Sequence, residues 1–95
     1  MNNREKRQTI NDVYLKLDYQ KNDTRYTVHN ISRGGLRFSS HKIFEIDERV
    51  GITVYLPNDK THQAKGRICY FEINKDSHEG NYYGLSFLDN YLMIT

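Results

Sequence analysis

The pattern of hydrophobic and polar residues predicts an all-β chain. Apolar side chains recur mostly at every second position, as in strands that bury one face, and no stretch before the last few residues keeps a helical period. The predicted strands cover residues 13–20, 24–31, 36–38, 50–56, 61–74 and 82–87. Six short antiparallel strands separated by turns favour a small barrel, because closure removes exposed strand edges.

Strand parity also predicts which side chains face the core. In the first run these are Val13, Leu15, Leu17 and Tyr19. The loose stretch 41–49 offers three apolar side chains as plugs of the barrel, namely Ile43, Phe44 and Ile46. The strand 61–74 changes from small to bulky residues, which is typical of a strand that bends around a barrel corner. The final segment, Asp89–Thr95, is expected to begin a short helix or to form a tail.

Length and charge point to one domain with a basic N-terminal arm. A chain of 95 residues has room for a single core, so we expect residues 12–95 to form one barrel domain. Residues 1–11 are expected to be a flexible arm, in which Arg4, Lys6 and Arg7 outnumber the single acid Glu5. The whole chain has 14 basic and 12 acidic residues, a balance that does not indicate a DNA- or RNA-binding protein.

The single cysteine and the absence of long apolar runs bear on location. Cys69 has no second cysteine with which to form an internal disulfide, which fits a reducing compartment and predicts a cytoplasmic protein. No window approaches the roughly 20 apolar residues of a spanning helix, and no apolar run follows the charged N-terminus, so membrane insertion is not expected.

Catalytic and metal-binding patterns are missing from the sequence. The four histidines lie apart, with no spacing typical of metal ligands: His29, His41, His62 and His78. There is no phosphate-binding GxxxxGK[ST] loop and no serine in a nucleophile elbow. The acidic residues fall mainly in turns and on solvent-facing strand positions, which does not indicate a carboxylate pair for acid–base catalysis. We therefore expect no enzyme, no catalytic residue, no metal and no cofactor.

The most distinctive segment is Asn30-Ile-Ser-Arg-Gly-Gly35. Asn30 and Ser32 are two residues apart at a strand end, so their side chains point to the same face. Both donate and accept hydrogen bonds, and Gly34 and Gly35 allow the backbone to approach a ligand closely. This combination suits a planar, hydrogen-bonding base such as guanine. The alternative is an ordinary turn, which the same residue types form routinely.

The pattern Asn30-x-Ser32-x-x-Gly35 is similar to the (Asp/Asn)-x-Ser-x-x-Gly motif of the PilZ family, bacterial receptors for cyclic di-GMP. The continuation from Ser32 to Phe38 and the segment Tyr83-Gly-Leu-Ser-Phe87 also resemble that family, so the resemblance covers nearly the whole chain. It implies a PilZ-like barrel that binds cyclic di-GMP through Asn30, Ser32 and Gly35, with Arg33 and Gly34 as secondary candidates.

The family also has an Arg-x-x-x-Arg arm before its first strand, whose guanidinium groups fold over the dinucleotide. Such groups can grip a phosphate or the O6/N7 edge of guanine with two hydrogen bonds. In this chain two residues, not three, separate Arg4 from Arg7. The resemblance implies that Arg4 and Arg7, with Lys6 as a further candidate, contact the ligand.

Three functional hypotheses follow. In the first, cyclic di-GMP binding orders the arm and changes a surface that a protein partner reads, in motility, biofilm formation or a related bacterial process. In the second, favoured by the irregular arm, a degenerate PilZ-like barrel binds no cyclic di-GMP and contacts a protein through outward tyrosines, expected at Tyr14, Tyr55 and Tyr83. A small barrel that binds single-stranded nucleic acid is the third hypothesis, and the balanced charge argues against it.

Overall fold

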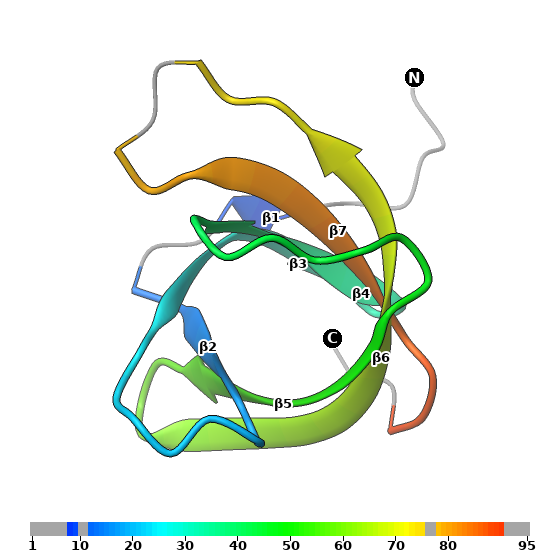
Figure 1. The fold of residues 1–95 in the computed structure, drawn as a ribbon. Helices are drawn as coiled ribbons and strands as arrows, with labels where there is room; N and C mark the ends of the chain where they lie inside the picture. The colour runs from blue at the N-terminus through cyan, green and yellow to red at the C-terminus, as the bar shows by residue number, and fades with distance from the viewer. Residues whose placement is uncertain (1–7, 10–11, 76–77, 91–95) are drawn as a thin grey trace, which may run out of the picture.

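The computed structural model describes residues 8–9, 12–75 and 78–90 (Figure 1). All regular structure in these ranges is β-strand, which confirms the all-β prediction. The strands are β1 Gln8–Thr9, β2 Tyr14–Leu17, β3 Tyr26–Ser32, β4 Gly35–Ser40, β5 Arg49–Leu56, β6 Lys60–Glu72 and β7 Asn81–Phe87. None of the described residues forms a helix long and apolar enough to cross a membrane.

Strands β2 to β7 close into the antiparallel barrel predicted from the sequence. β3 pairs with β2 along one edge and with β4 along the other, and the ring continues from β4 through β7, β6 and β5 back to β2 (Figure 1). The short strand β1 was not predicted. It adds to the β2 side of β3, where Gln8 pairs with Ile31 and Thr9 with Asn30.

Alternate side chains of the barrel strands fill its interior, as the period-two pattern requires. The core residues are Val13, Leu15, Leu17, Tyr26, Val28, Ile31, Leu36, Phe38, Phe44, Val50, Ile52, Val54, Ala64, Ile68, Tyr83, Leu85 and Phe87. Burial of this apolar set is the main favourable contribution to folding in a chain with no disulfide.

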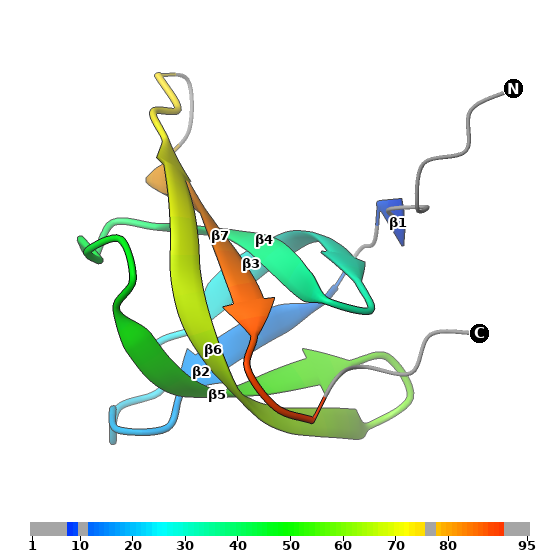
Figure 2. The ribbon, with the colours of Figure 1, turned by 90° about the vertical axis from the view of Figure 1, so that its right-hand side faces the viewer.

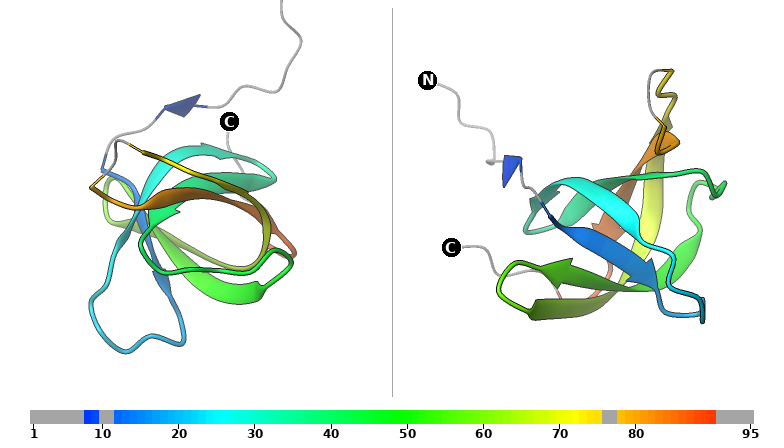
Figure 3. Two further views of the ribbon diagram at one scale, coloured as in Figure 1. Left: turned by 45° about the horizontal axis from the view of Figure 1, so that its top comes forward. Right: turned by 90° about the vertical axis from the view of Figure 1, so that its left-hand side faces the viewer.

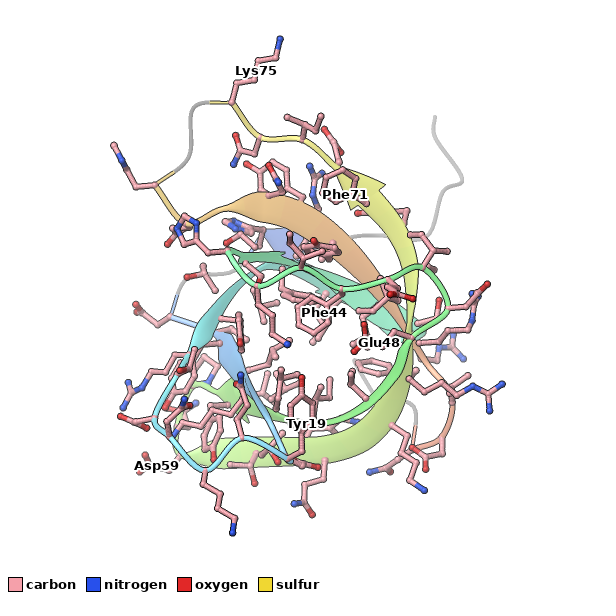
Figure 4. All side chains as sticks on the ribbon, viewed as in Figure 1. Tyr19, Phe44, Glu48, Asp59, Phe71 and Lys75 are labelled. Carbon is pink, nitrogen blue, oxygen red and sulfur yellow. The ribbon has the colours of Figure 1, made fainter. Side chains whose placement is uncertain are left out.

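Residues 41–48 run across one end of the barrel, and Phe44 points from this loop into the opening (Figure 4). Phe44 is 5% exposed, so its prediction as a plug is confirmed. The same prediction for Ile43 and Ile46 is wrong, because their exposed fractions are 81% and 52%. The loop has no strand parity. Only Phe44 turns inward, where its ring packs edge-on against Tyr83.

Two tyrosines also differ from the prediction. Tyr19, expected in the core, is 55% exposed, because β2 ends at Leu17 and the chain turns there with a hydrogen bond from the Gln20 amide to the Leu17 carbonyl. Tyr83, expected to point outward, is 1% exposed. It lies opposite the inward-facing Phe38. The outward positions of β7 are therefore those of its two neighbours in the chain, Tyr82 and Gly84.

The long strand β6 curves along the barrel and continues beside β7 past the end of its pairing with β5 (Figures 2 and 3). A bulge interrupts its pairing with β7: Ile68 lies opposite Leu85, whereas Tyr70 lies opposite Gly84. The bulge therefore leaves Cys69 as an extra residue. It places Cys69 and Tyr70 at the outer face, next to the segment singled out in the sequence.

Candidate functional site

The outer face of β3, β4, β7 and β6 carries two rows of side chains. Strand pairing defines the first row as Asn30, Arg37, Gly84 and Tyr70. It defines the second row as Ser32, Gly35 and Ser86. Each row contains a glycine, Gly84 in the first and Gly35 in the second; the ring of Tyr70 packs against Gly84, and the Leu85 carbonyl lies close to Gly35. These rows border a hollow that has polar groups on β3 and an aromatic residue on β6.

This hollow is a pocket of about 160 Å³. It is lined by Asn30, Ser32, Gly34, Gly35, Leu36, Cys69, Tyr70, Gly84, Leu85 and Ser86. The structure thus brings together the predicted candidates Asn30, Ser32, Gly34 and Gly35 at one pocket. Its wall combines amide, hydroxyl and backbone groups with an aromatic side chain, which is a composition suited to a flat polar ligand.

The turn between β3 and β4 holds the motif residues in place. Ser32 lies opposite Gly35, and its hydroxyl donates a 3.4 Å hydrogen bond to the Gly35 carbonyl. The Gly34 carbonyl accepts a hydrogen bond from the Phe87 amide, which ties the turn to β7. A Cβ atom on Gly35 would lie 2.2 Å from the carbonyl oxygen of Leu85. The motif glycine is therefore required by the close approach of β4 to β7.

The two arginines near the motif lie outside the pocket lining. Arg33 is exposed at the tip of the β3–β4 turn. Arg37 turns toward β6 and β7, where it donates a 2.9 Å hydrogen bond to Glu72 Oε1 and its guanidinium carbon lies 4.0 Å from the centre of the Tyr82 ring. Neither guanidinium therefore lines the pocket itself.

Strand β1 pairs with the strand that carries the motif. The predicted contacts Arg4, Lys6 and Arg7 lie outside the described residues. The next residue in the chain, Gln8, pairs with Ile31 between the two motif side chains of β3, and Thr9 pairs with Asn30.

His29 adds a titratable group next to Asn30. Its Nε2 lies 3.0 Å from the Ser39 hydroxyl and 3.8 Å from Glu79, and its ring packs edge-on against Tyr82. Burial lowers the pKa of His29, an effect that the nearby Glu79 carboxylate opposes and Arg37 reinforces. No group of three or more potential metal ligands occurs among the described residues.

Several pocket residues were not predicted as site residues. Gly84 lies within the Tyr83–Phe87 segment whose resemblance was noted, so that segment carried a signal for one wall of the pocket. Cys69 and Tyr70 had no such signal. Their outward position depends on the bulge in β6, which shifts the strand parity by one residue.

Comparison with known proteins adds one positive finding. The family model described as "PilZ domain" matches residues 2–92. No curated protein and no solved structure matches the chain significantly. The family match spans the basic arm, the pocket motif and every strand of the barrel.

Proposed function

Because the chain belongs to the PilZ domain family, a family of cyclic di-GMP-binding domains, we propose that it is a receptor module that binds cyclic di-GMP at the Asn30–Ser32–Gly35 pocket. The observation that carries this proposal is the convergence of the motif residues on one pocket. The amide of Asn30 and the hydroxyl of Ser32 can both donate to and accept from the edge of a guanine base. Gly35 allows β4 and β7 to lie close together, and the pocket is lined at this point by Gly35, Leu85 and Ser86.

The size of the pocket fits part of the ligand. Sites for whole drug-sized molecules typically have volumes of roughly 300–1,000 Å³, whereas this pocket has about 160 Å³. In our proposal one guanine occupies the pocket, and the phosphates and the second base lie over the neighbouring surface. The pairing of Gln8 with Ile31 and of Thr9 with Asn30 supports this arrangement, since it joins β1 to the strand that carries the motif. Arg4 and Arg7, with Lys6, then neutralise the phosphates.

The proposed receptor senses and does not catalyse. In our proposal the arm gains anionic partners when the ligand binds, and it then adopts one arrangement in place of many. A protein partner can distinguish the ligand-bound state from the ligand-free state. Bacterial signalling of this kind takes place in the cytoplasm, which is the location we propose.

Isothermal titration calorimetry tests the proposal with cyclic di-GMP as ligand and with GTP and cyclic di-AMP as controls. We expect selective binding of cyclic di-GMP, and a loss of about tenfold or more in affinity for Asn30→Ala and Ser32→Ala, because each removes hydrogen bonds to the base. Asn22→Ala is the matched control, since Asn22 is exposed and its side chain caps only the Thr24 amide.

Two outcomes would contradict the proposal. Absence of binding by the folded wild-type protein would favour the alternative, a PilZ-like barrel that serves a protein partner without the nucleotide. Binding that is unaffected by Asn30→Ala and Ser32→Ala would place the ligand elsewhere on the barrel.

A further inference from the structure

Tyr70 is the aromatic residue of the pocket, and its position depends on a glycine in the neighbouring strand. It lies opposite Gly84 after the bulge in β6. Its ring occupies the space that a side chain at position 84 would fill, because a Cβ atom there would lie 2.1 Å from Tyr70 Cε2 and 2.4 Å from Cδ2. The ring is therefore laid against the backbone of β7 at the border of the pocket.

Among the described residues, no other aromatic ring packs against the ring of Tyr70. It is half-buried, yet none of the ring pairs found among the described residues includes it, and none of the hydrogen bonds found there includes its hydroxyl. The ring of Tyr82, in contrast, contacts the Arg37 guanidinium and packs edge-on against the His29 ring. A half-buried aromatic ring that borders a small polar pocket is able to accept a flat ligand against it.

We infer that Tyr70 is a specificity-determining residue of this pocket, against which a purine base stacks while Asn30 and Ser32 read its edge. The inference rests on the proposed function and extends it to residues that the family motif does not contain. Hydrogen bonds from β3 fix the edge of the base, and the ring on β6 selects for a flat aromatic ligand. Gly84 acts as a positioning residue, because only a residue without a side chain lets the ring lie there.

Substitution of Tyr70 tests the stacking role by calorimetry with cyclic di-GMP. Tyr70→Leu keeps an apolar side chain but removes the ring, and we expect the affinity to fall by about 5- to 150-fold, the range typical of base–aromatic stacking. Tyr70→Phe keeps the ring, and we expect its affinity to stay within about threefold of wild type. Tyr19→Leu is the matched control, since Tyr19 is an exposed tyrosine outside the pocket lining.

A spectroscopic measurement locates the base independently of affinity. The chain contains no tryptophan, so the tryptophan emission of the Tyr70→Trp variant, excited at the red edge where tyrosine does not absorb, reports on this position alone. We expect cyclic di-GMP to change this emission. The single thiol, Cys69, also lines the pocket, and we expect bound ligand to slow its reaction with a thiol reagent. A ligand bound elsewhere would change neither signal.

The outcomes separate this inference from the proposed function. If Asn30→Ala loses affinity while Tyr70→Leu binds like wild type, the receptor function stands and the stacking role is wrong. If Tyr70→Leu and Tyr70→Phe lose affinity equally, the hydroxyl or the fold matters and not the ring face, which also overturns the inference. If the wild-type protein does not bind cyclic di-GMP, both fail. Circular dichroism of each variant establishes that the barrel is folded.

Discussion

The imidazole Nε2 of His29 lies 3.0 Å from the hydroxyl of Ser39, a side chain that is almost completely buried. The pair joins β3 to β4 on the outer face of the barrel, next to the proposed ligand pocket. Burial lowers the pKa of His29, although the Glu79 carboxylate at 3.8 Å acts in the opposite direction. The folded protein therefore favours the neutral imidazole.

This relationship predicts that the protein loses stability as the pH falls below about 6.5, the ordinary pKa of histidine. In that range the unfolded chain binds a proton at this residue more readily than the folded protein, so the free energy of unfolding decreases. We expect His29→Gln to have a flatter dependence between pH 7.5 and 5.5, measured by urea unfolding at each pH.

Two other groups with shifted pKa values act outside this window. The hydrogen bond from Lys16 lowers the pKa of Asp23, which matters only in more acidic solution, and the same contact raises the pKa of Lys16, which matters only in strongly basic solution. His78→Gln is the control, because this exposed histidine lies outside the contacts of His29 with Ser39, Glu79 and Tyr82. A wild-type dependence in His29→Gln would exclude the proposed cause.

Adjacent glycines in the motif are expected to respond differently to alanine. A Cβ atom on Gly35 would meet the Leu85 carbonyl oxygen at 2.2 Å, and backbone atoms of a paired strand yield little. We expect Gly35→Ala to lower the free energy of unfolding by about 1–3 kcal/mol. Gly34 has open space around its Cβ direction, so Gly34→Ala should cost less than about 0.5 kcal/mol. Urea unfolding of both variants measures the difference, and equal losses would refute this explanation.

Strand parity predicted most of the core but failed where the chain leaves the strands. The alternation in the first run placed Val13, Leu15 and Leu17 correctly, and it failed at Tyr19 because the chain turns after β2. The motif Asn30-x-Ser32 was found from sequence because both residues share a strand face. Tyr70 was not, since its outward position results from a bulge that shows only in the pairing of β6 with β7.

The loop across the barrel opening offers a comparison between substitutions at two adjacent residues, one buried and one exposed. Phe44 packs against three aromatic side chains of the core, whereas the preceding Ile43 is exposed. We expect Phe44→Ala to lower the free energy of unfolding by about 3–5 kcal/mol through lost burial and a cavity. Ile43→Ala should change it by less than about 0.5 kcal/mol. Thermal and urea unfolding test both values, and a small effect at Phe44 would mean that the loop does not close the barrel.

The contacts of Arg37 predict that its ring contact matters more for stability than its ion pair. Glu72 is exposed, so its pairing with Arg37 is screened by water, and Glu72→Gln should cost no more than about 0.5 kcal/mol. Arg37→Ala also removes the guanidinium and its carbon stem from the Tyr82 ring, for which we expect a loss of about 1 kcal/mol. Urea unfolding distinguishes the two, and a larger loss in Glu72→Gln would show that the ion pair dominates.

The arm gives the last prediction, which depends on the proposed receptor function. If Arg4 and Arg7 neutralise the phosphates of cyclic di-GMP, Arg7→Ala should weaken binding by roughly ten- to a hundredfold, the value of one hydrogen bond to a charged group. Arg4→Ala should act in the same direction. Neither should change the free energy of unfolding measurably without ligand.

Arg49→Ala is the matched control, because this exposed arginine lies outside the pocket lining. Calorimetry at two salt concentrations adds a second criterion, since removal of a phosphate contact should weaken the salt dependence of binding. If an arm variant has unchanged affinity and unchanged salt dependence, the substituted arginine does not contact the ligand, and the irregular spacing explains why.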